Sequence, residues 1–126
     1  TLLLAACGSA PAAAPSPAAA GPGADLAAKG KTLFTQYQCN TCHGVGGEKL
    51  VGPPLNGVAG SKVKLEGGQE VTADEAYLKE SISSPDAKVV AGFSKGVMLA
   101  VVQPKLSEIT QPDNLAALVA YIQSLK

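Results

Sequence analysis

The sequence predicts one small, mostly α-helical domain with a short β-hairpin, preceded by a disordered or extended tether. Three observations support this fold class. Apolar residues recur at helical spacing in three stretches, a Gly-Gly pair separates two short strand-like runs, and residues 8–24 contain only Ala, Gly, Pro and Ser. The 126 residues leave room for one domain and an appendage.

The composition argues against nucleic-acid binding and predicts a thin hydrophobic core. Ten lysines balance ten acidic residues, so the chain lacks the basic excess that is typical of nucleic-acid binding. Only five residues are aromatic, which allows a thin hydrophobic core for a domain of about a hundred residues. A large apolar prosthetic group would relieve that shortage, although the composition does not require one.

The first seven residues resemble the end of a bacterial lipoprotein signal. Leu4-Ala5-Ala6-Cys7 is similar to a lipobox, in which the cysteine becomes the lipidated first residue after cleavage. We therefore expect residues 1–7 to be a signal remnant ending in a lipidated Cys7. The alternative is an apolar segment with an incidental cysteine.

Residues 8–24 are expected to form an Ala/Pro-rich tether. The prolines interrupt any helix, and polyproline geometry at roughly 3 Å per residue would give a span on the order of 50 Å. Such a tether would hold the domain near a membrane and let it reach partners. A linker that packs along a neighbouring subunit would have the same composition.

The folded domain is expected to span residues 25–126 and to open with a helix. Asp25 suits the N-terminus of a helix over residues 25–38, with apolar positions that include Leu33, Phe34 and Tyr37. A Gly- and Pro-rich loop covers 44–60. Short runs at 63–65 and 69–71 flank Glu-Gly-Gly, which predicts a small hairpin.

Two further helices are predicted in the second half of the domain. Thr72 and Glu75 form a capping box that opens the first of them, and Pro85 ends it. Residues 86–109 are expected to be an irregular wrap. The last helix is predicted to open at Thr110, with Asp113 three residues on. The expected apolar faces are Ala76, Leu78 and Ile82 (with Tyr77 beside them) in the first helix, and Leu115, Leu118, Val119, Ile122 and Leu125 in the second.

The strongest chemical signal is the Cys-x-x-Cys-His run from Cys39 through Cys42 to His43. This pattern is the signature of c-type haem attachment: two thiols one turn apart add to the two vinyl groups of a porphyrin, and the histidine ligates the iron. A structural zinc site would need four Cys or His ligands, and a thioredoxin-like pair would need a βαβ pattern. A disulfide remains possible, but it would leave His43 without a role.

From about residue 25 to 126 the chain resembles a class I cytochrome c. Gly30 and Phe34 are similar to residues of the family's first helix that contact the terminal helix, where Tyr121 has the matching place. The resemblance implies three main helices around one haem. Gly52-Pro53-Pro54-Leu55 is similar to the family's Gly-Pro-x-Leu loop. By that likeness the Pro53 carbonyl accepts the second ring N–H of His43, and Leu55 packs on the haem.

The resemblance also indicates the sixth iron ligand. His43 is the sole histidine and Met98 the sole methionine, so ligation by two histidines would need another chain. Met98 stands where the family places its axial methionine, although Leu99 follows it where the family often has Pro. A thioether ligand favours reduced iron and raises the potential. The alternative is that Met98 fills a gap in the core, with Lys95 or water at the iron.

A more specific likeness covers residues 71–98. This stretch is similar to cytochrome c domains fused to subunit II of haem–copper oxidases and to mono-haem lipoprotein subunits of alternative complex III. It implies partners that are redox proteins or a membrane electron-transfer complex. In the family, haem c is attached outside the cytoplasmic membrane, and with the lipobox this implies a lipid-anchored position on the periplasmic face of the bacterial cytoplasmic membrane. The chain lacks the copper domain of subunit II, which favours a free-standing carrier or subunit.

The function expected from these features is one-electron transfer by a covalent haem c, not enzymatic catalysis. Two alternatives remain open: an open-site haem enzyme acting on peroxide or another small ligand, and a structural subunit whose haem completes its core. The chain has no arginine and no second histidine to serve such an enzyme. Lys62, Lys64 and Lys95 are candidates for a docking rim.

Overall fold

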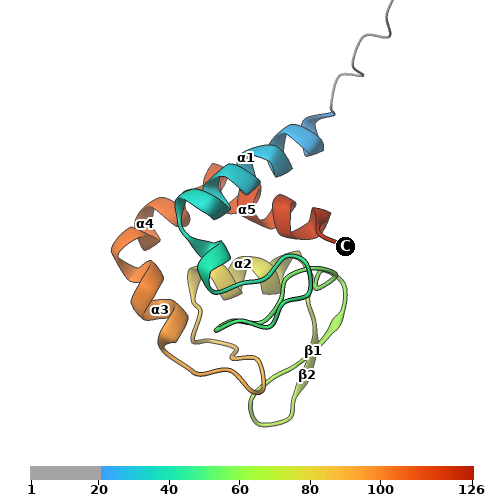
Figure 1. The fold of residues 1–126 in the computed structure, drawn as a ribbon, viewed down its shortest axis with the longest axis vertical. Helices are drawn as coiled ribbons and strands as arrows, with labels where there is room; N and C mark the ends of the chain where they lie inside the picture. The colour runs from blue at the N-terminus through green and yellow to red at the C-terminus, as the bar shows by residue number, and fades with distance from the viewer. Residues whose placement is uncertain (1–20) are drawn as a thin grey trace, which may run out of the picture.

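The computed structural model describes residues 21–126. The predicted signal remnant with Cys7, and residues 8–20 of the predicted tether, lie outside the described residues. The elements, drawn in Figure 1, are α1 (Pro22–Gln36), η1 (Cys39–Thr41), β1 (Lys62–Lys64), β2 (Glu70–Thr72), α2 (Glu75–Ser83), α3 (Val97–Val102), η2 (Gln103–Lys105), α4 (Leu106–Ile109) and α5 (Pro112–Ser124). The domain is mostly helical with one small antiparallel sheet, as the sequence predicts.

Helix α1 begins three residues before the predicted start at Asp25. Gly21 is the N-cap and Pro22 occupies the first helical position, where a proline loses no hydrogen bond and its fixed φ suits the helix. Residues 22–24, placed by the sequence in the Ala/Pro-rich tether, therefore form the first turn. The helix ends at Gln36, and Gln38 turns the chain with a left-handed φ of 61°.

Helices α1 and α5 cross and pack against each other (Figure 1). A Cβ atom on Gly30 would stand 1.9 Å from the Ala117 carbonyl oxygen, so only glycine permits this approach. One turn on, the rings of Phe34 and Tyr121 pack edge to face with centroids 5.3 Å apart. The contact between the first and last helices is the one that the family resemblance predicted.

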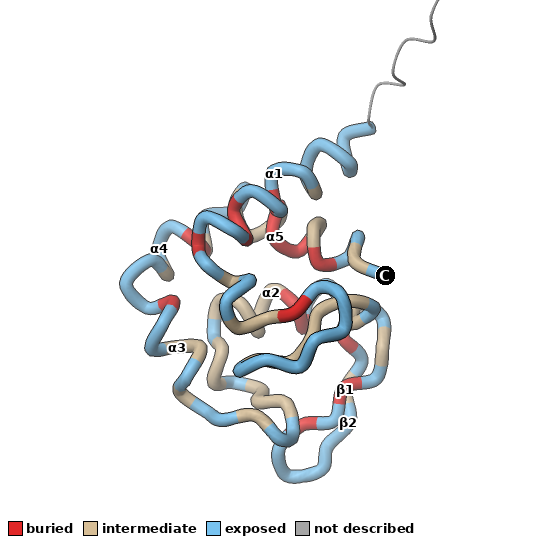
Figure 2. Tube along the Cα trace, in the orientation of Figure 1, coloured by how far each residue is buried: buried red, intermediate tan, exposed pale blue. Residues whose placement is uncertain are grey.

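The core has two hydrophobic clusters, and α5 contributes to both. Figure 2 shows buried positions along α1, α5 and α2. The first cluster comprises Leu33, Phe34, Tyr37, Val102, Ile109, Ala117 and Leu118. The second comprises Val63, Leu65, Ala73, Tyr77, Leu78, Val119 and Ile122. The predicted apolar stripe of the last helix is therefore buried at Leu118, Val119 and Ile122, and half-buried at Leu115 and Leu125.

The predicted hairpin is present. Strands β1 and β2 are antiparallel, with Val63 opposite Val71. Gly67 and Gly68 have φ of 88° and 90°, which β-branched and bulky residues rarely adopt. The Gly-Gly pair therefore allows the turn that the sequence indicated.

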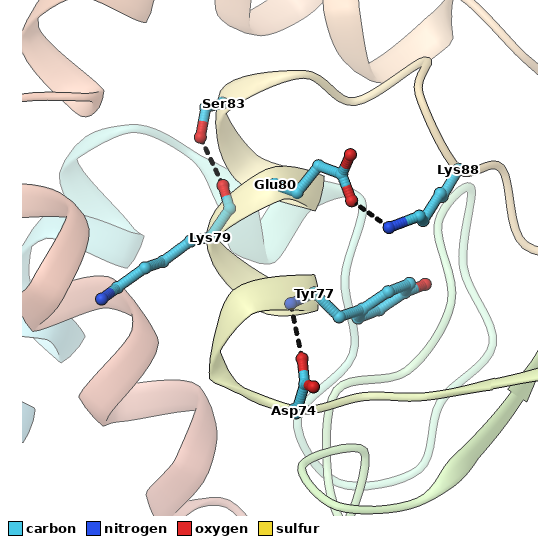
Figure 3. A network of polar contacts seen from close by, with 6 residues as sticks. All are labelled: Asp74, Tyr77, Lys79, Glu80, Ser83 and Lys88. Atoms are coloured by element: carbon cyan, nitrogen blue, oxygen red, sulfur yellow. Dashed lines mark hydrogen bonds and ion pairs between the residues drawn. The ribbon is translucent and has the colours of Figure 1, made fainter.

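Helix α2 ends as predicted but is capped differently. Asp74 is the N-cap, and its carboxylate accepts a 2.8 Å hydrogen bond from the Tyr77 backbone N–H (Figure 3). The prediction that Thr72 opens a capping box was wrong. Thr72 belongs to β2, and its hydroxyl accepts a hydrogen bond from the Lys62 ammonium. Pro85 ends the helix after Ser83. On the apolar face, Tyr77 is buried and the predicted Ala76 is exposed.

The expectation of an irregular wrap over residues 86–109 was wrong in its second half. Helix α3, η2 and α4 follow one another from Val97 to Ile109 (Figure 1). The run Val97–Val102 is apolar throughout, so it shows no helical period from which sequence analysis could identify a helix. The last helix begins at Pro112 rather than Thr110, because the Thr110 hydroxyl donates back to the Leu106 carbonyl instead of capping α5.

No helix in the described part of the chain has the length and apolar character needed to cross a bilayer.

Candidate functional site

A mostly apolar cavity lies between the cysteine motif, the proline loop, α2 and the segment leading into α3. Its walls include Phe34, Cys39, His43, Pro53, Leu55 and Met98. The first five of these residues belong to the first half of the domain, whereas Met98 belongs to the second half. The fold therefore brings the two halves of the chain together at this cavity. All the predicted haem-contacting residues except Cys42 line this cavity.

The His43 imidazole is fixed by a hydrogen bond from its Nδ1 to the Pro53 carbonyl oxygen, 2.8 Å away. A carbonyl only accepts, so Nδ1 carries the proton and Nε2 keeps its lone pair for a metal. Burial lowers the pKa of His43, and the Pro53 carbonyl opposes that effect. The ring is therefore held neutral and in the tautomer that a metal ligand needs.

The backbone around Pro53 is held against the cysteine motif. The N–H of Gly52 donates to the Cys42 carbonyl at 2.8 Å, and the N–H of Leu55 donates to the Gly44 carbonyl at 2.9 Å. A Cβ on Gly52 would stand 2.6 Å from His43 Cε1. Glycine at this position therefore allows the loop to close on the imidazole.

The two cysteines are free and occupy different positions relative to the cavity. Cys39 lines it, whereas Cys42 is half-buried and is not part of the wall. Burial raises the pKa of the Cys39 thiol to about 11, so this sulfur is a neutral thiol at physiological pH and not a reactive thiolate. That state does not suit a thioredoxin-like exchange pair.

The zinc alternative also lacks support in the structure. Among residues 21–126, no three His, Cys, Asp or Glu side chains gather as a metal site would require. A metal bound at His43 would thus depend on a cofactor or on a softer ligand such as the Met98 thioether.

Met98 comes from the first turn of α3 and is half-buried at the cavity. Gly96 precedes that helix with a left-handed φ of 83°, and its N–H donates to the Asp86 carboxylate at 2.8 Å. This contact secures the turn that leads to Met98. Leu55 also lines the cavity and packs against both core clusters.

The residues present fit a haem. The cavity wall is dominated by apolar side chains, while Cys39, an oriented imidazole and a thioether supply an attachment point and two kinds of iron ligand. Ser81 lies in the same wall, and its hydroxyl oxygen is buried without a hydrogen-bond partner in the described structure. A cavity occupant with polar substituents could satisfy that hydroxyl, which otherwise costs about 1–3 kcal/mol.

Comparison with known proteins decides the family. The family model described as "Cytochrome c" matches residues 27–126, which is most of the chain and contains every cavity residue named above. This chain belongs to the cytochrome c family. The cytochrome is also 29% identical over 109 residues to cytochrome c2 from Agrobacterium tumefaciens (strain II Chrys), an alignment that covers 75% of this chain and 87% of that protein.

The family and the fold together make the cytochrome a class I cytochrome c, whose work is haem-based electron transfer with a covalently bound haem c. Of the three lysines considered for docking, Lys62 and Lys64 lie on β1 and Lys95 lies before α3. All three are exposed, and none of them lines the cavity. The lysine docking rim stays a prediction.

Sequence analysis missed three features of this site. It did not identify Ser81, whose place on the helix carries no motif. It did not foresee that Val51 and Val97 are exposed and also line the cavity. It also missed Lys49, whose ammonium lies 5.1 Å from the centroid of the Phe93 ring, another cavity residue. Of these residues only Val51 could have been suspected, because the apolar Leu50-Val51 pair directly follows the charged Glu48-Lys49 pair in a loop.

Proposed function

We propose that this cytochrome carries a single haem, attached through Cys39 and Cys42 and ligated by His43 and Met98, and that it acts as a membrane-tethered one-electron carrier or subunit. The observation that carries the proposal is the His43–Pro53 hydrogen bond at a cavity that Met98 also lines. It leaves Nε2 free for iron and supplies a thioether from another part of the chain.

Each residue has a defined task in this proposal. The Cys39 and Cys42 thiols each add S–H across a vinyl group, so that a C–S bond and a C–H bond form and no group leaves. The bound haem supplies the one-electron Fe(III)/Fe(II) couple. Pro53 orients the imidazole, Leu55 and Phe34 exclude water, and the Met98 thioether favours the reduced state and raises the potential.

The proposed setting is the periplasmic face of a bacterial cytoplasmic membrane, with Cys7 lipidated and the Ala/Pro-rich segment as the tether. The lipobox-like sequence supports the anchor. The likeness of residues 71–98 to oxidase-fused and alternative complex III cytochromes supports a membrane complex as partner. Mass spectrometry of the protein from a lipoprotein-processing host tests the anchor: an unmodified Cys7 would refute it.

The central test is an absorbance and redox titration of the purified holoprotein beside two variants. Ferric haem with a thioether ligand shows a weak charge-transfer band at the red end of the visible spectrum. We expect that band in the wild type, its loss in Met98→Ala together with a lower potential, and its retention in Leu99→Ala. Leu99 is the matched control, since it neighbours Met98 in α3 but does not line the cavity.

Other outcomes would correct the proposal in specific ways. A c-type spectrum that keeps the band in Met98→Ala would contradict methionine ligation. A high-spin wild-type spectrum with ready binding of peroxide or carbon monoxide would favour the open-site enzyme instead. A protein that acquires no covalent haem in a host competent for its attachment would refute the carrier altogether.

A further inference from the structure

A lysine and an aromatic ring connect the two segments that carry the proposed iron ligands. Lys49 lies six residues after His43, in the loop that follows the cysteine motif, and Phe93 lies five residues before Met98. The Lys49 ammonium lies 5.1 Å from the centroid of the Phe93 ring, which is within the range of a cation–π interaction. We call this pair the Lys49–Phe93 clasp. It joins two segments that are far apart in the chain, beside the cavity that Phe93 lines.

The loop that carries Lys49 is held to the cysteine motif. The Gly52 N–H donates to the Cys42 carbonyl at 2.8 Å and closes the base of this loop, so Lys49 extends from a short stretch with fixed ends. Within residues 21–126, the Lys49 ammonium has no hydrogen bond and no ion pair. The Phe93 ring is therefore the partner that the described structure gives to this charge.

The segment that carries Phe93 is hydrogen-bonded at both ends and exposed between them. At one end the Ala91 N–H donates to the Lys64 carbonyl at 2.9 Å, and at the other the Gly96 N–H donates to the Asp86 carboxylate at 2.8 Å. The residues on both sides of Phe93 are exposed, whereas Phe93 itself is half-buried. Its ring is thus the large apolar side chain by which this stretch packs at the cavity.

Two glycines leave the same segment weakly confined. Gly92 and Gly96 have left-handed φ of 87° and 83°, and a Cβ at either position would meet nothing within 4 Å. Neighbouring atoms therefore do not restrict the chain at these two points, where glycine already gives the backbone its greatest freedom. Met98 follows the second glycine by two residues. A contact that holds the Phe93 ring consequently also restricts the position of the Met98 thioether.

We propose that the Lys49–Phe93 clasp positions the Met98 segment and opposes release of the thioether from the haem iron. The inference rests on the proposed function, in which Met98 ligates the iron. Lys49 and Phe93 are positioning residues, because they act on the iron through the segment that carries Met98. A cation–π contact at an exposed site is weak, so its loss changes the rate of release by a small factor and leaves the fold intact.

The test measures cyanide binding to the ferric holoprotein by stopped-flow absorbance at neutral pH. Cyanide binds the iron only after the thioether leaves, so the rate at saturating cyanide reports that release. At this pH the probe is mostly uncharged hydrogen cyanide, which gives its proton to the solvent on binding, so surface charge has little effect on its approach. For Lys49→Met, which keeps an apolar stem and removes the charge, we expect the rate to rise about threefold.

Three further variants separate the clasp from a general effect of charge. Lys49→Arg should keep the wild-type rate, because a guanidinium also stacks on an aromatic ring. Lys31→Met should keep it too, since it removes an exposed lysine of α1 outside the cavity wall. Phe93→Leu removes the ring, and adding Lys49→Met to that variant should have no further effect on the rate. Phe93→Ile takes its place if Phe93→Leu does not take up haem.

The outcomes separate the clasp from the proposed function. A Lys49→Met protein that shows the thioether band and binds cyanide at the wild-type rate would overturn the clasp and leave the carrier standing. An equal rise in Lys31→Met, or a rise from Lys49→Met that persists without the Phe93 ring, would also overturn it. So would a rise that matches a loss of stability in urea, since global unfolding would then expose the iron. A wild-type protein without the thioether band would instead refute the proposed ligation.

Discussion

The helix pair and the cavity are built on opposite principles. Helices α1 and α5 meet through direct contact of protein atoms, as close as the Gly30–Ala117 crossing and the Phe34–Tyr121 ring pair. Most of the cavity wall comes from the loop at 51–58, α2 and the segment that leads into α3, and these parts face a space instead of one another, with Phe34 of α1 and Leu118 and Ile122 of α5 closing one side. The two helices cross through contacts between protein atoms, whereas the rest of the cavity wall is shaped to surround a bound group.

The difference indicates which property a substitution changes in each region: the stability of the fold at the helix pair, and the position of site residues at the cavity. At the helix pair, an added atom collides with backbone and acts on stability. At the cavity, an added atom can displace a functional side chain while the two core clusters remain. Substitutions at glycines of the two regions separate these effects, because each region has one glycine packed against a neighbour.

The largest effect is expected for Gly30→Ala. The new Cβ would stand 1.9 Å from the Ala117 carbonyl oxygen and 2.7 Å from Tyr121 Cβ, so the helices must move apart. We expect a loss of about 3 kcal/mol or more in the free energy of unfolding, measured by urea denaturation of the holoprotein. Gly23→Ala is the matched control, since nothing lies within 4 Å of that position on the same helix. If both variants unfold alike, the helix contact does not limit stability.

For Gly52→Ala we expect a smaller loss of stability than for Gly30→Ala, together with a change in the position of the His43 imidazole. Its Cβ would stand 2.6 Å from His43 Cε1 and 2.9 Å from Nδ1, so the imidazole must shift. We expect a change in haem spin state or potential with a loss of about 1–2 kcal/mol in stability. Gly60→Ala serves as the spectral control: nothing lies within 4 Å of the added atom, and its φ of 78° strains only the backbone, so it should lose stability without changing the haem spectrum. A Gly52→Ala spectrum identical to the wild type would contradict the role of this loop.

The smallest effect is expected for Tyr37→Phe on the helix-pair side. The Tyr37 hydroxyl donates to the Glu108 carboxylate at 2.9 Å, which ties α1 to α4, and we expect its loss to cost about 1 kcal/mol. Burial, with Glu108, raises the pKa of Tyr37 above its usual 10.0. Between the unfolded and folded pKa values the unfolded chain loses the proton first, so stability is full below pH about 10 and falls as pH rises through the folded pKa.

The measurement for Tyr37→Phe is the urea midpoint of both proteins at neutral pH and above pH 10. The wild type should lose more stability than the variant across that interval. Equal losses in the two proteins would show that another group controls the alkaline behaviour.

The sequence predicted the parts of the fold that depend on local chemistry. Gly67 and Gly68 specified the hairpin because few other residues adopt their φ values, and Pro85 ended α2 because it cannot continue a helix. The His43–Pro53 hydrogen bond was expected from the likeness of one short loop to a family, and the structure contains it.

The parts that sequence analysis could not predict depend on competition between partners. Thr72 and Thr110 both had the side chain of a helix cap, but one lies in a strand and the other bonds back to Leu106. The run Val97–Val102 is apolar at every position, so it has no helical periodicity from which α3 could be predicted. Nothing local distinguishes Ser81, which is unpaired at the cavity, from Ser83, which donates to the Lys79 carbonyl (Figure 3).

The exposed start of α1 has a mechanical consequence. Residues 22–29 form two turns that are almost wholly exposed, and in Figure 1 they project beyond the rest of the domain. At about 1.5 Å per residue they make a stiff arm about 12 Å long. A pull on Pro22 would act along this arm as far as Gly30, which is the first buried residue of α1 and the point where α1 crosses α5. The close crossing at Gly30 is thus placed where tension from the N-terminal side would enter the described part of the fold.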